Sequence, residues 1–282
     1  MLIEDIRLIE IEIHSKCNRK CSWCPNSIID RSFYEEMDES IYLSLLNQLK
    51  REEYGNTISY SRYNEPMLNI KLLKTRTSQA KILLPNCKLV TNTNGDFLFE
   101  DSLKNLSINE LSIMDYDCNG LDKAIKKLIS CNIVIDSINY PIIKAHYDNI
   151  TILYYVDWTK HVELENRGGF FNNEELYANV KWKNINEKRD YPCNEPMFFV
   201  GIDYNGNTTP CCNIRSDNIN HKEAIMGDVK SSTLYDIINS DKAMGFKKTM
   251  SLGNYSEYPS SCAFCHKGEG RYTKDSPSIN YE

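Results

Sequence analysis

The first two-thirds of the sequence alternate short apolar runs of strand character with segments of helical spacing. This alternation is typical of βα units built around a parallel sheet. The pattern predicts strands at 7–13, 56–61, 88–93, 110–116, 133–138 and 150–156, and helices at 39–50, 68–74 and 121–129. Asp38 or Ser40 can cap the first helix. Six parallel strands are too few for a closed eight-stranded barrel. We therefore expect an α/β fold with a partial (β/α)6 TIM-like barrel over residues 1–162.

The pattern changes near Glu163, where a second and smaller module begins, predicted over residues 163–282. The stretch N-R-G-G (166–169) is typical of a loop. Residues 198–212 alternate as a β-hairpin with Asn205-Gly206 at its turn, and residues 232–240 have helical spacing. The second module is expected to be a linker followed by a hairpin and a helix.

Composition excludes several classes of protein. The 282 residues are 41% hydrophobic and 26% charged, as in an ordinary globular chain, and no run approaches the ~20 apolar residues of a membrane span. The net charge of -6, without a Lys/Arg-rich stripe, argues against a nucleic-acid partner. The N-terminus lacks the pattern of a signal peptide, so we expect a cytoplasmic protein. Since the cytosol keeps thiols reduced, its eleven cysteines indicate metal ligation rather than disulfides.

Three cysteines, Cys17, Cys21 and Cys24, stand directly after the first predicted strand in C-N-R-K-C-S-W-C. A zinc site would need a fourth ligand, for which His14 at the end of the strand is a candidate. A [4Fe–4S] cluster held by three thiolates would instead leave one iron open to a non-protein ligand. The second arrangement is that of a reactive cluster.

The spacing C-x3-C-x2-C with an aromatic residue before the last cysteine resembles the radical S-adenosylmethionine superfamily. The resemblance implies that the open iron binds the amino and carboxylate groups of S-adenosylmethionine. In that family an electron from the cluster cleaves the sulfonium, and the resulting 5′-deoxyadenosyl radical removes a hydrogen atom from the substrate. Trp23 would border the adenosine and the cluster, the alternative being a plain packing aromatic.

Two further stretches match the superfamily. R-Y-N-E-P (62–66) resembles the motif that holds the methionine amino group, which implies this role for Glu65, although Asn64 replaces the family's glycine. T-N-G (93–95) resembles the segment near the cofactor ribose, which implies that Thr93 and Asn94 contact S-adenosylmethionine. An ordinary loop is the alternative for this second stretch.

Four cysteines of the second module, Cys193, Cys211, Cys262 and Cys265, would fully coordinate either a second [4Fe–4S] cluster or zinc, and their spacing does not separate the two. A P-C hairpin followed by C-x2-C resembles the Twitch-type auxiliary-cluster module of the SPASM/Twitch radical enzymes. This resemblance implies one auxiliary cluster, hence two [4Fe–4S] clusters in all. Cys212 could replace Cys211, and the P-C position favours Cys211.

Within this group the chain resembles radical dehydrogenases that oxidise a hydroxyl of an aminocyclitol. The resemblance implies oxidation of a hydroxyl carbon in a small polar molecule such as an aminocyclitol or sugar. The auxiliary cluster would accept an electron from the substrate. An external one-electron donor such as flavodoxin or ferredoxin would reduce the N-terminal cluster. Arg167 of N-R-G-G becomes a candidate substrate contact or base. Because a guanidinium pKa lies above ~12, positioning or charge stabilisation is its safer role.

Two other functions stay open. The first is maturation of a ribosomal peptide by cross-linking or epimerisation. An epimerase would need a hydrogen donor such as Cys118, Cys131 or Cys212. Peptide maturases often carry an N-terminal peptide-binding domain, and since the first strand is predicted to begin near residue 7, we expect that such a domain could only be a separate protein, which favours a small molecule. The second, a non-enzymatic iron–sulfur or zinc protein, conflicts with the open triplet.

Overall fold

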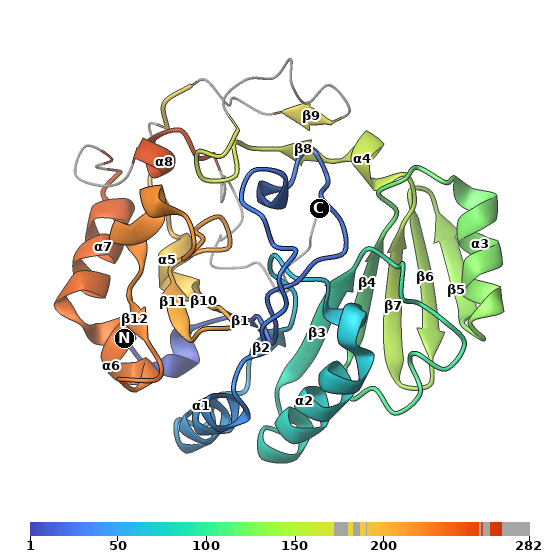
Figure 1. Ribbon diagram of the computed structural model, residues 1–282, viewed down its shortest axis with the longest axis horizontal. Coiled ribbons are helices and arrows are strands. Elements are labelled where there is room, and N and C mark those ends of the chain that lie inside the picture. The colour runs from blue at the N-terminus through green and yellow to red at the C-terminus, as the bar shows by residue number, and fades with distance from the viewer. Residues whose placement is uncertain (172–179, 183–186, 190, 254, 256–259, 267–282) are drawn as a thin grey trace.

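A computed structural model describes residues 1–171, 180–182, 187–189, 191–253, 255 and 260–266 (Figure 1). Its strands are β1 Leu8–Ile11, β2 Thr57–Ser59, β3 Lys88–Thr93, β4 Glu110–Met114, β5 Val134–Asn139, β6 Ile142–Tyr147, β7 Ile150–Tyr155, β8 Glu163–Leu164, β9 Lys181–Trp182, β10 Phe199–Ile202, β11 Asn207–Thr209 and β12 Gly227–Asp228. Its α-helices are α1 Glu39–Arg51, α2 Ile70–Leu83, α3 Leu121–Ser130, α4 Trp158–His161, α5 Glu195–Phe198, α6 Leu234–Asn239, α7 Asp241–Ser251 and α8 Ser260–Ala263.

Ten strands form one sheet in the order β12-β11-β10-β1-β2-β3-β4-β7-β6-β5, while β8 and β9 pair separately. The six strands from β10 to β7 in this order run parallel. Glu10 is the one charged residue among the buried residues of β1 to β4, all of which are described. Such a low charge is expected for strands that are covered on both sides. The partial barrel of six parallel strands predicted from the alternating pattern is confirmed.

The identity of one parallel strand was predicted wrongly. Residues 133–138 contribute β5, which pairs antiparallel with β6, and β6 in turn pairs antiparallel with β7. The sixth parallel strand is β10, which lies beside β1. The prediction missed β6 because Tyr140-Pro141, the two residues between β5 and β6, lack the Asn and Gly that usually mark a hairpin turn.

The predicted helices are present with altered bounds. Asp38 caps α1 by accepting a hydrogen bond from the Ser40 amide, as one of the two predicted caps. The helix expected at 68–74 is longer: a 3-10 helix, η3 Pro66–Asn69, leads into α2, which continues to Leu83. No regular helix lies between β3 and β4, whose connecting residues 94–109 are all described.

The predicted hairpin is formed by β10 and β11, with Gly206 at a φ of +87° in its turn, and β12 extends it. Helix α6 confirms the predicted helix, and α7 follows it directly. A small core of Ile214, Ala224, Phe246 and Met250 lies in this part of the chain. Because β10 pairs with β1, the sheet runs across the domain boundary expected at 162/163, which stays a prediction.

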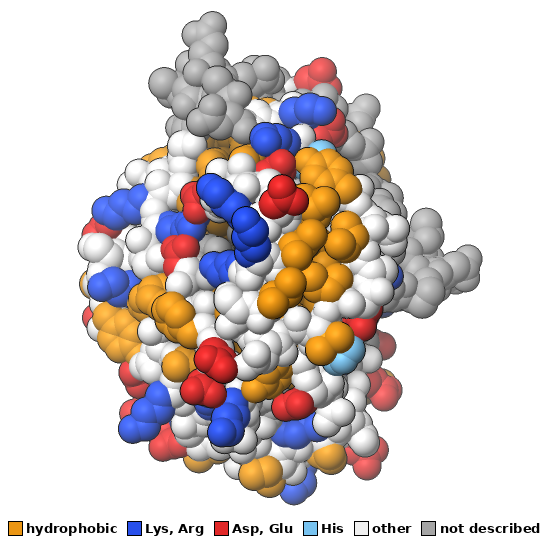
Figure 2. Space-filling view, turned by 90° about the vertical axis from the view of Figure 1, so that its right-hand side faces the viewer, with side chains coloured by type: hydrophobic (Ala, Val, Ile, Leu, Met, Phe, Trp, Pro, Cys, Tyr) orange, Lys and Arg blue, Asp and Glu red, His pale blue; other side chains and the backbone are white. Residues whose placement is uncertain are grey.

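The main core consists of side chains from the sheet and the helices packed against it. At the β5 end of the sheet some hydrophobic side chains are exposed, among them Ile129, Val134 and Ile138, and Figure 2 shows a hydrophobic band on this face. Among the described residues, no helix is long and apolar enough to cross a membrane.

Candidate active site

A cavity of about 520 Å³ opens at the carboxyl ends of the parallel strands. The loop after β1 and the residues that follow β2, β3, β4 and β7 contribute to its wall. In barrels of this kind, reactive groups sit on the loops that leave the carboxyl ends of the strands. The fold therefore places the predicted functional loops around one space.

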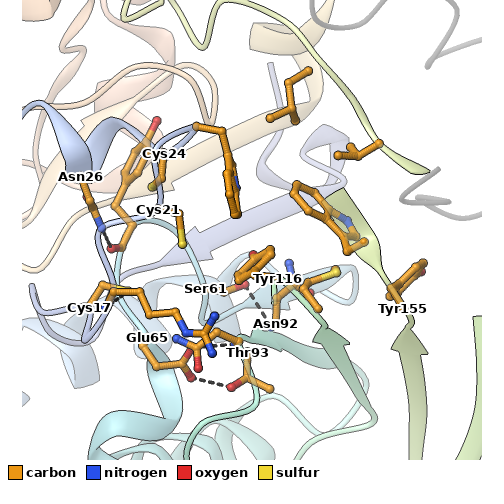
Figure 3. Close-up of a pocket in the computed structure, with 18 of the residues that line it drawn as sticks. Cys17, Cys21, Cys24, Asn26, Ser61, Glu65, Asn92, Thr93, Tyr116 and Tyr155 are labelled. Atoms are coloured by element: carbon orange, nitrogen blue, oxygen red, sulfur yellow. Dashed lines mark hydrogen bonds between the residues drawn. The ribbon is translucent and has the colours of Figure 1, made fainter. Parts of the chain in front are cut away.

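The loop after β1 brings Cys17, Cys21 and Cys24 to this cavity (Figure 3). The Cys24 amide donates to the Cys21 carbonyl at 2.9 Å, which forms a tight turn between the last two cysteines. Just after Cys24, the Asn26 side chain donates to the Tyr63 carbonyl at 2.8 Å. The second half of the loop is thus fixed to the residues that follow β2.

Burial raises the pKa of Cys17 to about 12 and that of Cys21 to about 11. Burial also raises the pKa of Cys24, which the positive charges of Arg167, Arg215 and Arg31 oppose. A buried thiolate needs a compensating cation, which the iron of a cluster supplies. Three half-buried thiols on one cavity wall are compatible with the open cluster, which stays a prediction.

His14, the candidate fourth zinc ligand, is fully buried and does not belong to the cavity wall. Its ring lies 5.3 Å from the ring of Tyr34, and burial lowers its pKa to about 4. Within the described residues, no three His, Cys, Asp or Glu side chains group as ligands to a single metal ion. The structure does not bring His14 to the thiols as a fourth ligand.

Glu65 lies at the N-terminus of η3, 3% exposed, on the same cavity wall. Its carboxylate accepts hydrogen bonds from the Thr93 hydroxyl at 2.6 Å and from the amides of Asn94 and Met67 at 2.8 and 3.1 Å. Burial nevertheless raises the pKa of Glu65 to about 7. Thr93 and Asn94 also line the cavity, so the three residues predicted to contact S-adenosylmethionine lie together. Figure 3 shows Glu65 beside Thr93.

Polar contacts that the sequence did not reveal join the cysteine loop to the ends of β3 and β4. Arg19 donates to Asp96 through Nε at 2.7 Å and to Asp117 through Nη1 at 2.9 Å. The Asn94 side chain donates to the Asn18 side chain at 2.9 Å. Because Asn18 and Arg19 stand between the first two cysteines, these bonds hold the loop over the sheet.

Trp23 lines the cavity as part of an aromatic group. Its ring centroid lies 5.7 Å from that of Tyr116 and 6.5 Å from that of Trp158. Tyr116 and Trp158 are themselves 5.1 Å apart in an edge-on arrangement. Trp23 therefore makes aromatic packing contacts on the cavity wall, and its place beside the adenosine stays a prediction.

The N-R-G-G loop carries Arg167 into the same cavity wall. Arg167, Gly168 and Gly169 all have positive φ, at +53°, +69° and +85°. A Cβ on Gly168 would lie 2.7 Å from the Asn213 carbonyl oxygen, so the loop requires glycine here. The Nε of Arg167 is buried without a hydrogen-bond partner among the described residues. A non-glycine residue in the left-handed region is a recurrent feature of functional sites.

Arg62 is a cavity residue that sequence reasoning missed. Its guanidinium donates to the Ile214 carbonyl at 3.0 Å and lies 3.5 Å from the Glu10 carboxylate. A Cβ on Gly201 of β10 would lie 1.5 Å from Nη1 of Arg62, so this glycine makes room for the arginine. The only available signal was the position of Arg62 just before the N-E-P motif.

Three of the four cysteines predicted to hold the second cluster pack against the small core of the second module, and the fourth is Cys265. Cys193, Cys211 and Cys262 pack against the cluster of Ile214, Ala224, Phe246 and Met250. Cys265 is tied in by Asn213, whose side-chain amide donates to its sulfur at 3.5 Å, and by Arg189, which donates to its carbonyl at 2.8 Å. Full coordination of a second cluster by these four thiols stays a prediction.

Cys212 lines the large cavity, whereas Cys211 packs against the small core of the second module. Its carbonyl accepts a hydrogen bond of 2.6 Å from the Tyr63 hydroxyl. This arrangement supports the choice of Cys211 as the cluster ligand and leaves a thiol on the wall of the cavity.

Comparison with known proteins identifies the family of the chain. The SPASM iron–sulfur cluster-binding domain family matches residues 193–266. An S-adenosyl-L-methionine-dependent 2-deoxy-scyllo-inosamine dehydrogenase from Niallia circulans is 30% identical over 249 residues, 88% of each chain. The crystal structure of BtrN in complex with AdoMet and 2-DOIA has a TM-score of 0.69 and 24% identity, over 93% of this chain and 94% of that one. BtrN in an open conformation gives a TM-score of 0.61 at 24% identity, over 93% and 92%.

The partial barrel, the three-cysteine loop and the match to the SPASM family identify a radical enzyme with an auxiliary-cluster module. The chain belongs to the radical S-adenosylmethionine superfamily, in its SPASM/Twitch group.

Proposed function

We propose that this protein is a radical S-adenosylmethionine dehydrogenase that oxidises a hydroxyl carbon of an aminocyclitol or a similar small polar molecule. The observation that carries the proposal is the meeting of Cys17, Cys21, Cys24, Glu65 and Arg167 around one cavity. The identity with a 2-deoxy-scyllo-inosamine dehydrogenase over 88% of both chains supports the substrate class.

Each group of residues has a distinct part in this function. The three N-terminal cysteines would hold a [4Fe–4S] cluster, and Cys193, Cys211, Cys262 and Cys265 a second one. When bound, the first cluster and S-adenosylmethionine supply the 5′-deoxyadenosyl radical, and the second accepts an electron. Glu65 would hold the methionine amino group, with Thr93 and Asn94 fixing its carboxylate. Arg167 would orient the substrate hydroxyl and stabilise negative charge on its oxygen.

The cavity supports a small substrate. Its volume of about 520 Å³ falls in the range of small-molecule sites. Glu10, Asn92 and Glu165 add polar groups to a wall that also contains Trp23 and Tyr116. Such a mixture of aromatic and polar groups is suited to a ring that carries several hydroxyl or amino substituents.

Epimerisation, including that of a peptide, is the second candidate function. The observation that favours it is the presence of Cys212 on the cavity wall, where a thiol could return a hydrogen atom to a substrate radical. A dehydrogenase does not need such a donor.

Two cellular features complete the proposal. Eleven cysteines, seven of them assigned to clusters, need a reducing compartment, which supports a cytoplasmic location. An external one-electron donor such as flavodoxin or ferredoxin would reduce the N-terminal cluster. We propose neither a nucleic-acid partner nor a membrane partner.

The test uses anaerobically reconstituted enzyme, a one-electron reductant, S-adenosylmethionine and 2-deoxy-scyllo-inosamine. We expect one ketone and one 5′-deoxyadenosine per S-adenosylmethionine consumed, and neither product with Cys21→Ala. Solvent deuterium on the substrate carbon, without a ketone, would replace dehydrogenation with epimerisation. No turnover of this compound or of related aminocyclitols would refute the proposed substrate class.

A further inference from the structure

Oxidation of a hydroxyl requires an acceptor for its proton, and a guanidinium with a pKa above ~12 is already protonated. We propose that Glu165 accepts the hydroxyl proton, and that Asn213 couples this carboxylate to the auxiliary cluster through Cys265. The proposal rests on the proposed dehydrogenase function and deepens it, because it assigns the proton acceptor of that same site.

The position of Glu165 supports the first part. Its half-buried side chain lines the cavity, two residues before Arg167, which lines it as well. Among the charged groups that raise the pKa of Arg167, the carboxylate of Glu165 has the largest effect. A carboxylate beside a guanidinium can accept a proton while the guanidinium stabilises the developing alkoxide.

The contacts of Asn213 support the second part. Its side-chain nitrogen donates to Glu165 Oε1 at 2.8 Å and to Cys265 Sγ at 3.5 Å. The Glu165 carboxylate and a cluster-bound Cys265 thiolate are both acceptors, so only the nitrogen end of the amide suits this place. The side-chain amide of Asn213 thus connects Glu165, on the cavity wall, to Cys265, a predicted ligand of the second cluster, through two hydrogen bonds.

Asn213 is held firmly enough for this role. The residue is 1% exposed and follows Cys211 and Cys212 directly. Its backbone carbonyl lies against Gly168, so the N-R-G-G loop and the cysteine hairpin are packed together at this residue. The loop that carries Glu165 and Arg167 is therefore positioned by the same residue that contacts Cys265.

The step balances as follows. The substrate C–H bond breaks and its hydrogen atom goes to the 5′-deoxyadenosyl radical, while the O–H bond breaks and its proton goes to Glu165. A carbon–oxygen double bond forms, and the remaining electron reduces the second [4Fe–4S] cluster, the oxidant. Hydrogen bonds and charges near the sulfurs set the potential of such a cluster. A proton on Glu165 removes a negative charge from this network and favours reduction of the cluster, so the two transfers assist each other.

The first test does not use substrate. The midpoint potential of the auxiliary cluster is measured by spectroscopically monitored titration in full-length protein whose three N-terminal cluster cysteines are alanine. We expect Glu165→Gln to shift the potential to a more positive value, and Glu223→Gln, an exposed charge-matched control, to leave it unchanged. In Asn213→Leu protein, Glu165→Gln should shift it far less. An unchanged potential in Glu165→Gln would overturn the coupling.

The second test measures ketone formed per 5′-deoxyadenosine with 2-deoxy-scyllo-inosamine. We expect Glu165→Gln to lower this ratio at least about tenfold while 5′-deoxyadenosine still forms, and Glu165→Asp to restore part of it. A wild-type ratio in Glu165→Gln would refute Glu165 as the proton acceptor. If wild-type enzyme does not oxidise this compound but the potential shifts as expected, the proposed substrate is wrong and the link between Glu165 and Cys265 stands.

Discussion

The close approach of the N-R-G-G loop to Asn213 predicts a specific cost for Gly168→Ala. Gly168 has a φ of +69°, and the new methyl group would lie 2.7 Å from the Asn213 carbonyl oxygen. The left-handed backbone alone costs an alanine about 1–2 kcal/mol. Forcing a group into a packed region adds about 1–3 kcal/mol, because a backbone carbonyl cannot rotate away as a flexible side chain can. The expected loss of stability is about 2–5 kcal/mol.

Gly253→Ala is the matched control. Gly253 also has a positive φ, +70°, but the Cβ that the substitution would add lies no closer than 3.7 Å to any atom of a non-neighbouring residue, an ordinary van der Waals contact. It should lose only the backbone cost of about 1–2 kcal/mol. Urea unfolding of both variants, as reduced apo-proteins, measures the two losses of stability. Ketone formation after reconstitution of the clusters measures the effect on activity. We expect Gly168→Ala also to lose more than about tenfold in ketone formation, because a misplaced reacting group is costly. Equal stability losses in the two variants would refute the packing argument.

Three further predictions concern other parts of the molecule. Cys193→Ala should lower the iron content from about eight to about four per chain, whereas Cys212→Ser, on the cavity wall, should retain about eight; equal contents in the two variants would contradict the ligand assignment. The folded-state pKa of Glu65, about 7, lies above its ordinary value of 4.5, so apo-protein stability should fall by up to about 3 kcal/mol as pH rises from 4.5 to beyond 7. The free energy of unfolding of Glu65→Gln, measured across the same pH range, should not show this decline. Parallel pH dependences in wild type and Glu65→Gln would contradict the assignment of the decline to Glu65. Gly201→Ala should destabilise the protein by about 3–5 kcal/mol in the same assay, because the methyl group displaces buried Arg62 from its carboxylate partner; a loss under 1 kcal/mol would show that the arginine can relocate.

Local patterns were sufficient to predict the elements that carry the N-terminal site. Strand β1 leads into a loop with three cysteines, and the following loops end parallel strands, so their side chains had to meet at one edge of the sheet. Likewise, Asn205-Gly206 predicted the turn between β10 and β11. These features depend on residues that are close in sequence.

Long-range pairings were not predictable in this way. The pairing of β1 with β10 joins strands that lie about 190 residues apart, and no periodicity records such a contact. For the same reason the sequence did not show that Asn213 contacts Glu165, or that Cys211 and Cys212 diverge. The N-R-G-G loop and the P-C hairpin are each visible in the sequence, but only the fold brings them together.

Isotope transfer tests the central claim most directly. The enzyme is reduced and incubated with S-adenosylmethionine and an aminocyclitol that carries deuterium on the carbon to be oxidised. The account predicts one deuterium atom in the 5′-deoxyadenosine for each ketone formed, and no deuterated product from Cys21→Ala. Ketone formation with unlabelled 5′-deoxyadenosine, or unchanged labelling in Cys21→Ala, would contradict it.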